Sequence, residues 1–129
     1  MGGVYRLLSN RFNVRQKNIM IKINIKPLSV NEAWKGKRYR SDKYINYQKD
    51  LGYLLKPMKL PPPPYKIYFE FGFSSAASDW DNPIKPAQDI ICKYLGFDDK
   101  HIHEANVKKV KVKKGEEYLM FDIQALRYD

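Results

Sequence analysis

The chain has 129 residues, 43% of them hydrophobic, which suits one domain with a substantial core and excludes a disordered basic tail. Lys and Arg number 24 against 14 Asp and Glu, a formal net charge of +10. Such an excess indicates nucleic acid first and an anionic membrane surface second as a partner, with a merely soluble basic protein as the third possibility. Cys92 is the only cysteine, which excludes an internal disulfide and favours a reducing compartment such as the cytoplasm.

No apolar run approaches the roughly 18–20 residues that a membrane-spanning helix needs, so we expect no membrane-spanning segment. Residues 1–18 are rich in Arg, contain no acidic side chain and lack the apolar stretch of a secretory signal. We therefore expect a loosely ordered basic extension over residues 1–18, followed by a single domain over residues 19–129.

The first half of this domain contains a predicted strand and a predicted helix. Residues 19–25 alternate Ile with Met, Lys and Asn, the period of a half-buried strand. A polar stretch over residues 29–34 follows, and five of the six side chains at 35–40 are cationic or aromatic. Ser41 is a plausible N-cap for a helix over residues 42–56.

The middle of the chain predicts a second strand and a second helix. Four prolines at 61–64 form a stiff connector to a strand over 66–73 that carries phenylalanine on one face. Asn82 suits an N-cap, Pro83 suits the first helical position, and Gly96 suits the residue after the helix. The buried stripe predicted for this helix is Ile84, Ala87, Ile91, Tyr94 and Leu95.

Two further strands are predicted over residues 105–113 and 117–126, linked by a turn at 114–115. The resulting element order is β-α-β-α-β-β, without an internal repeat. We expect an α+β fold: a single domain in which two main helices pack on one mixed β-sheet.

Carboxylates gather where this basic chain would meet a polyanion. Asp79 and Asp81 would leave the same side of an extended backbone, and two such close anions cost free energy unless a cation bridges them. Lys85 and Asp89 are spaced i,i+4 at the start of the second helix, whereas the aspartates at 98–99 join them only if their loop folds back. A divalent metal held between carboxylates and phosphate is how many enzymes cut nucleic acid, so the pattern predicts a nuclease site.

Simpler interpretations stay open at this point. The aspartates before the helix also suit capping, and Lys85 with Asp89 also suits a solvated ion pair worth ~0.3–0.5 kcal/mol. The lysine run over 108–114 fits a wet strand face and a phosphate-binding face equally well. His101 and His103 do not have structural-zinc spacing.

The chain resembles the RusA family of Holliday-junction resolvases over about residues 21–126. Its segment 29–34, Ser-Val-Asn-Glu-Ala-Trp, is similar to an early Ser/Thr-Val-Asn-x-x-Trp element of that family. The pattern Asp-x-Asp-Asn-x-x-Lys-x-x-x-Asp at 79–89 follows, then Gly-Phe at 96–97, the Asp-Asp pair at 98–99 and a lysine-bearing strand. These elements occur in the order that the family has.

The resemblance implies a homodimer that cleaves four-way DNA junctions with Mg²⁺, for which Mn²⁺ can substitute. Matched by position, the implied metal ligands and catalytic carboxylates are Asp79, Asp81 and Asp99, the catalytic cation is Lys85, and the supporting residues are Asp89 and Asp98. The short segment after Gly96 leaves open which aspartate of the pair faces the site.

The predicted DNA-binding side chains are Lys35, Lys37, Arg38, Arg40, Lys108, Lys109 and Lys111. Trp34, Tyr39 and Trp80 are candidates for stacking on bases. Two other functions fit the same residues: a nuclease for flaps or other branched DNA, and a catalytically inactive DNA-binding protein.

Overall fold

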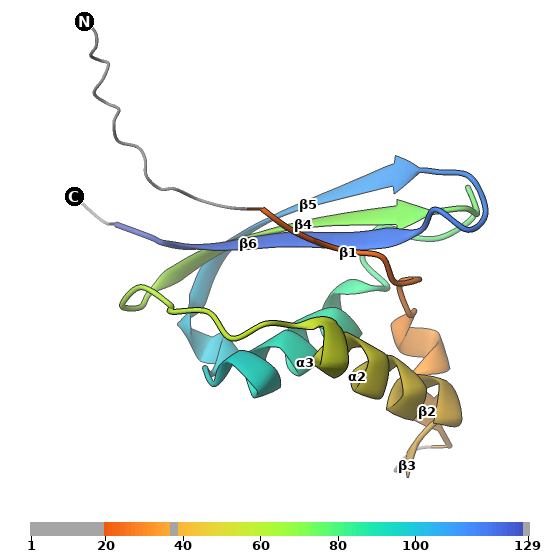
Figure 1. Cartoon of the computed structure of the whole chain (residues 1–129), viewed down its shortest axis with the longest axis horizontal. Coiled ribbons are helices and arrows are strands. Elements are labelled where there is room, and N and C mark those ends of the chain that lie inside the picture. Colours follow the sequence, from red (N-terminus) through yellow and green to blue (C-terminus); the bar gives the residue numbers. More distant parts are fainter. Residues whose placement is uncertain (1–19, 37–38, 128–129) are drawn as a thin grey trace, which may run out of the picture.

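The computed structural model describes residues 20–36 and 39–127, which form one four-stranded sheet, a small hairpin and two α-helices. In chain order the elements are β1 (Ile21–Ile23), η2 (Val30–Glu32), β2 (Trp34–Lys35), β3 (Tyr39–Arg40), α2 (Asp42–Leu54), β4 (Tyr65–Phe73), α3 (Ile84–Leu95), η3 (Asp99–His101), β5 (Ile102–Lys111) and β6 (Tyr118–Ala125). Both α-helices lie on the same side of the sheet (Figure 1). The predicted fold class is confirmed, whereas the β2–β3 hairpin and the two 3₁₀ turns were not predicted. The predicted extension over residues 1–18 lies outside the described residues.

The sheet has the strand order β1-β6-β4-β5 and is mixed. Strand β4 pairs in antiparallel fashion with β6 and in parallel fashion with β5. Parallel neighbours need a crossover connection, and α3 provides it between β4 and β5. The loop before α3 therefore starts at the carboxyl end of β4, and η3 leads into the amino end of β5.

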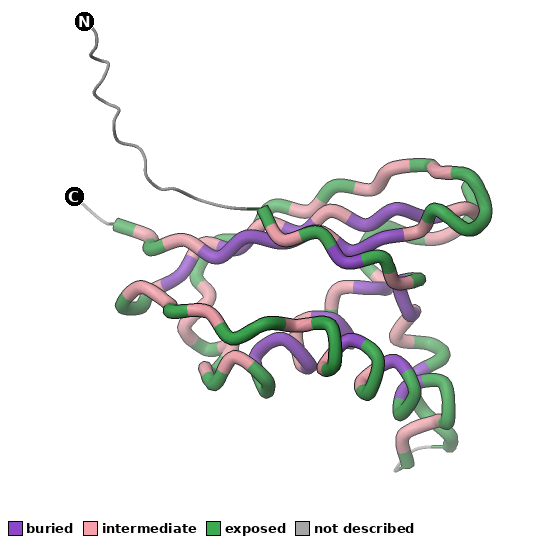
Figure 2. The backbone as a smooth tube through the Cα atoms, in the orientation of Figure 1, coloured by how far each residue is buried: buried purple, intermediate pink, exposed green. Residues whose placement is uncertain are grey.

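The core lies between the sheet and the two helices, where Figure 2 shows the buried stretches of both layers facing each other. Alternate residues of β4 are fully buried at Ile67, Phe69 and Phe71, as the period-2 pattern predicted. The other principal core residues are Tyr44, Tyr47, Leu51, Ala87, Ile90, Ile91, Leu119, Phe121 and Ile123. No helix within the described ranges is long and apolar enough to cross a membrane.

The α3 stripe differs from the prediction at one position. Tyr94 is 47% exposed, and Ile90 takes the buried place instead. Both Ile90 and Ile91 are one turn from Ala87, so the buried face follows that line and turns Tyr94 outward. The expectation that Tyr94 belongs to the core is wrong.

Of the predicted helix ends, those at Ser41 and Gly96 are confirmed and the one at Asn82 is not. Ser41 caps α2, because its side chain accepts a hydrogen bond from the Tyr44 N–H. Gly96 ends α3 in the left-handed region at φ 78°, as predicted for a C-terminal glycine. The N-cap prediction for Asn82 is wrong: α3 begins at Ile84, Pro83 occupies the cap position, and no side chain makes a capping hydrogen bond.

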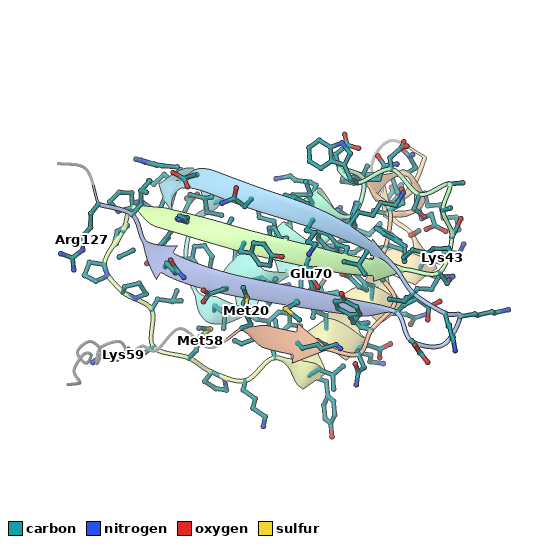
Figure 3. The ribbon with its side chains drawn as sticks, turned by 90° about the horizontal axis from the view of Figure 1, so that it is seen from above. Met20, Lys43, Met58, Lys59, Glu70 and Arg127 are labelled. Carbon is teal, nitrogen blue, oxygen red and sulfur yellow. The ribbon has the colours of Figure 1, made fainter. Side chains whose placement is uncertain are left out.

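The face of the sheet that the helices leave uncovered is polar, and Figure 3 looks onto it with Glu70 labelled on β4. The Glu70 carboxylate accepts hydrogen bonds from Tyr118 Oη at 2.5 Å and Tyr68 Oη at 2.6 Å. These bonds, the one from Tyr118 foremost, lower the pKa of Glu70. The Lys22 ammonium lies 4.5 Å from the centre of the Tyr118 ring. Glu70 thus points away from the phenylalanine face, as the strand alternation predicted.

Candidate active site

One half of the predicted site is assembled around Lys85, in the first turn of α3. Its Nζ lies 2.9 Å from Asp89 Oδ1, the expected i,i+4 pair, and 3.4 Å from Asp99 Oδ2. Gln88 Nε2 is 3.3 Å from the same Asp99 oxygen. The loop after α3 therefore folds back along the helix and brings Asp99 to Lys85, across 14 positions of the sequence.

Local capping decides which aspartate of the 98–99 pair faces α3. Asp98 Oδ1 accepts a hydrogen bond from the Lys100 N–H at 3.0 Å, which caps η3 and lowers the pKa of Asp98. That carboxylate is used within its own turn, whereas the next carboxylate, Asp99, contacts Lys85 and Gln88. Of the two aspartates, Asp99 is therefore the one that faces α3, and its role as a metal ligand stays a prediction.

The electrostatics around α3 follow from these contacts. The hydrogen bond to Asp89 is the main cause that raises the pKa of Lys85, and Asp99 adds to it, so the amine stays charged. Burial raises the pKa of Cys92 to about 12, with Asp99 and Asp89 contributing in the same direction. Cys92 is therefore a buried, protonated thiol and not a nucleophile.

The other half of the predicted site is the short segment that enters α3. Asp79 Oδ2 accepts a hydrogen bond from Asn82 Nδ2 at 3.3 Å, and the Asp81 carbonyl accepts one from the Ile84 N–H at 3.2 Å. The Val30 N–H donates to the Asn82 carbonyl at 2.8 Å. The segment bends and turns here, so it is not the extended strand for which parallel Asp79 and Asp81 side chains were expected.

The contact between Val30 and Asn82 joins the two sequence motifs that were singled out separately. Val30 belongs to η2, in the Ser-Val-Asn-Glu-Ala-Trp segment, and Asn82 belongs to the aspartate segment. A hydrogen bond between their backbones explains why both segments have a defined conformation next to each other. Sequence spacing carried no signal for this pairing, since more than fifty residues separate the two.

A cavity of about 360 Å³ opens beside Asp79, at the carboxyl end of β4. Its charged and polar walls include Lys26, Glu32, Ser74, Asp79 and Glu117. Asp99 instead lines a shallow hollow together with Asp89, at the far part of α3. Asp79 and Asp99 therefore face different hollows of the surface.

The chemistry of the carboxylates suits Mg²⁺, a hard cation that prefers oxygen ligands. Asp79 and Asp81 are exposed, and neither has an ion pair within residues 20–36 and 39–127. Among those same residues, no three His, Cys, Asp or Glu side chains lie close enough together to hold one ion. The structure thus brings Asp99 to Lys85 but does not bring Asp79, Asp81 and Asp99 together as a ready-made cluster.

The predicted cationic surface next to the site is only partly described. Lys35 is exposed on β2, while Lys37 and Arg38 lie outside the described residues. The Arg40 guanidinium is stacked between two aromatic rings, 4.0 Å from the Trp34 ring centre and 4.2 Å from that of Tyr44. This stacking holds the guanidinium in place and leaves its edges as hydrogen-bond donors.

Tyr44 links this stack to the acidic residues of α3. Burial raises the pKa of Tyr44 above its usual 10.0, Arg40 opposes that shift, and Asp89 reinforces it. Tyr44 is therefore within electrostatic reach of both Arg40 and Asp89. Tyr44 lies on α2, which packs against α3, so the Arg40 stack and the pair of Lys85 and Asp89 belong to neighbouring helices, which the composition of residues 35–40 did not reveal.

The three lysines predicted on the last parallel strand do not share one face. In the β4–β5 register, Lys108 pairs with Glu70, whereas Lys109 pairs with Phe71. Register-matched side chains project to the same face, so Lys108 lies on the uncovered face and Lys109 on the helix-covered one, with Lys111. Lys109 Nζ is used within the fold, where it donates to the backbone carbonyls of Ala76 and Ser78. The three lysines therefore do not line one face of the strand, and their predicted contact with DNA stays a prediction.

No protein-family model matches the chain, and comparison with curated proteins finds no significant match.

Proposed function

We propose that the chain is a divalent-metal-dependent endodeoxyribonuclease that resolves four-way DNA junctions. The observation that carries this proposal is the contact of Lys85 with Asp99, which joins two of the segments that the RusA resemblance marks as catalytic. A third such segment, with Asp79 and Asp81, leads directly into the same helix. Asp79 and Asp81 have no ion pair among the described residues and precede the helix that carries Lys85, which in a chain of net charge +10 suits phosphodiester chemistry better than helix capping alone.

Asp79, Asp81 and Asp99 would hold the Mg²⁺, or Mn²⁺ in its place. When bound, the ion polarises the phosphate and lowers the pKa of an attacking water. Lys85 would stabilise the negative charge that develops on the phosphate oxygens. Asp89 orients Lys85 through their 2.9 Å contact and keeps its amine protonated.

The substrate class is proposed from charge and symmetry. The stacked guanidinium of Arg40 and the exposed Lys35 would contact the DNA backbone near the Lys85 cluster. A four-way junction has two-fold symmetry, and paired nicks need two active sites, which a homodimer supplies. Such an enzyme would act in DNA recombination and repair, in the cytoplasm of a bacterial or phage-infected cell.

A second function is favoured by one specific observation. Because no cluster of three ligands is preformed among the described residues, a catalytically inactive protein that binds branched DNA also fits. In that case Lys85, Asp89 and Asp99 would form a structural ion-pair cluster only.

The deciding experiment incubates the protein with end-labelled four-way, flap and linear duplex DNA, in Mg²⁺, Mn²⁺ or EDTA. We expect paired nicks in the four-way junction with either metal and none in EDTA. Junction binding without cleavage in either metal would favour the inactive binder. Preferential cutting of flaps would assign the same site to another branched-DNA specificity.

A further inference from the structure

Lys109 makes contacts that neither the sequence pattern nor the proposed chemistry assigns. Its ammonium crosses from β5 to the loop that follows β4 and donates to two backbone carbonyls, those of Ala76, at 3.1 Å, and of Ser78. The side chain is half-buried and leaves the strand on the helix-covered face, beside the register position of Phe71. The Lys109 ammonium thus holds the backbone at two positions of the same loop, Ala76 and Ser78.

The loop that Lys109 holds leads directly into the aspartate segment. Ser78 immediately precedes Asp79, so a fixed Ser78 carbonyl fixes the backbone from which the Asp79 side chain starts. On its other side the segment is held by the bond between Asn82 and Val30. A loop of small, exposed residues would otherwise sample many conformations, at a conformational cost of roughly 1–2 kcal/mol for each residue that is ordered.

We propose that Lys109 is a positioning residue that holds the Asp79 loop in place for metal-dependent cleavage, rather than a phosphate-binding residue. This inference rests on the proposed nuclease function. Two of the three N–H donors of the ammonium already donate to backbone carbonyls, so only one is left to donate to a DNA phosphate. A carboxylate that is proposed to hold the metal gains from such support, because a displacement of about 1 Å at an active site costs roughly 10²-fold in rate.

The first arm of the test reports loop order without any catalysis. The chain has two tryptophans, so Trp34→Phe leaves Trp80, which is 57% exposed within the loop, as the only tryptophan. In that background, Lys109→Met should lower the fluorescence anisotropy of Trp80, because the loop loses both bonds. Lys109→Arg, which can donate to both carbonyls, should restore it. Lys108→Met should leave it unchanged, since that side chain lies on the other face of the sheet.

The second arm measures junction cleavage and binding with the full chain. Lys109→Met should reduce the single-turnover cleavage rate about 10- to 100-fold, while the junction Kd changes less than about threefold and loses none of its salt dependence. Lys109→Arg should regain most of the rate. Lys49→Met, which removes the same charge from the exposed part of α2, should cleave like the parent.

Each outcome decides the proposal. An unchanged Trp80 anisotropy in Lys109→Met would overturn it, and so would a loss confined to junction affinity, which is the behaviour of a phosphate contact. If the parent protein cuts no DNA, the nuclease proposal fails, and the anisotropy still shows whether Lys109 holds the loop. Should Lys109→Met not fold, as judged by circular dichroism, Lys109→Gln keeps one amide donor and should give intermediate values.

Discussion

The two α-helices begin in different ways. At the start of α2, Ser41 accepts a hydrogen bond from Tyr44 and donates one to the Glu32 carbonyl, so its hydroxyl satisfies two backbone groups. At the start of α3 no side chain caps the backbone, and Asn82 instead donates to the carboxylate of Asp79. A cap typically contributes about 1 kcal/mol, which α3 forgoes.

The difference in capping between α2 and α3 indicates a different role for the start of each helix. The first turn of α3 carries a cation, Lys85, where the helix dipole favours an anion, and this cation is kept in place by Asp89 and Asp99. Local rules of helix stability are broken at functional sites more often than elsewhere. The start of α2 is thus arranged for helix stability, whereas the start of α3 is the place where the proposed chemistry would occur.

The largest expected effect tests the chemistry at α3. Asp81→Asn should lower the rate of junction cleavage by roughly 10²-fold or more, because it removes one proposed metal ligand. Junction binding should stay the same or become slightly tighter, since a negative charge is lost from the proposed DNA-binding surface. Single-turnover cleavage and gel-shift titrations measure the two quantities separately.

The matched control is Asp50→Asn, which makes the same change on the exposed part of α2. It should alter neither cleavage nor binding by more than about twofold. An Asp81→Asn protein that cuts junctions as fast as the parent would show that the start of α3 holds no catalytic metal. The contrast between the two helix starts would then be structural only.

A smaller effect is expected from the cation between the two carboxylates. Lys85→Met should reduce cleavage about 10- to 100-fold, because it removes charge stabilisation from the reacting phosphate. The Lys85 side chain is 59% exposed, so the free energy of unfolding should change by less than ~1 kcal/mol. Lys93→Met, on the last turn of the same helix, serves as the control. A large loss of stability with unchanged cleavage would make Lys85 a structural residue.

Much of the fold follows from the sequence, because its signals are periodic and local. The alternation at Ile67, Phe69 and Phe71 fixed a buried strand face, and Ser41 and Gly96 marked helix ends by backbone chemistry that neighbours do not alter. Such features depend on residues within one turn or one strand, so the pattern alone predicts them.

The site was predicted less completely, because its contacts cross the chain. Nothing in the spacing of Asp98 and Asp99 shows which one turns toward α3. In the structure Asp98 accepts a hydrogen bond from the Lys100 N–H within its own turn, and Asp99 is the one that contacts Lys85. Lys109 was predicted to bind DNA, and the sequence pattern gave no sign of its hydrogen bonds to the loop after β4. Asn82 was predicted as a cap because residue type and position suit one, but in the structure its Nδ2 donates to Asp79 and no side chain caps α3.

A still smaller effect compares the two helix starts directly by stability. Ser41→Ala should lower the free energy of unfolding by about 1 kcal/mol, since the Tyr44 N–H loses its partner. Asn82→Ala should cost less than about half of that, because its side chain caps no backbone group and its carbonyl still accepts from Val30. Urea denaturation of both variants gives the comparison. Equal losses would mean that the amide of Asn82 stabilises α3 as much as a true cap.

The smallest effect concerns the pH dependence of the α2 start. The Glu32 carboxylate accepts a hydrogen bond from Lys43 Nζ at 2.9 Å, which is the main cause that lowers the pKa of Glu32 below its usual 4.5. A lowered folded-state pKa contributes stability above the unfolded value, and that stability is lost as the pH falls through the folded one. Because both groups are largely exposed, the contribution should be less than ~0.5 kcal/mol. Glu32→Gln should therefore have a slightly smaller free energy of unfolding than the parent at pH 7, and this difference should vanish at pH values below the folded-state pKa.

A difference in the free energy of unfolding that stays constant over this pH range would show that the pair contributes through packing and not through charge.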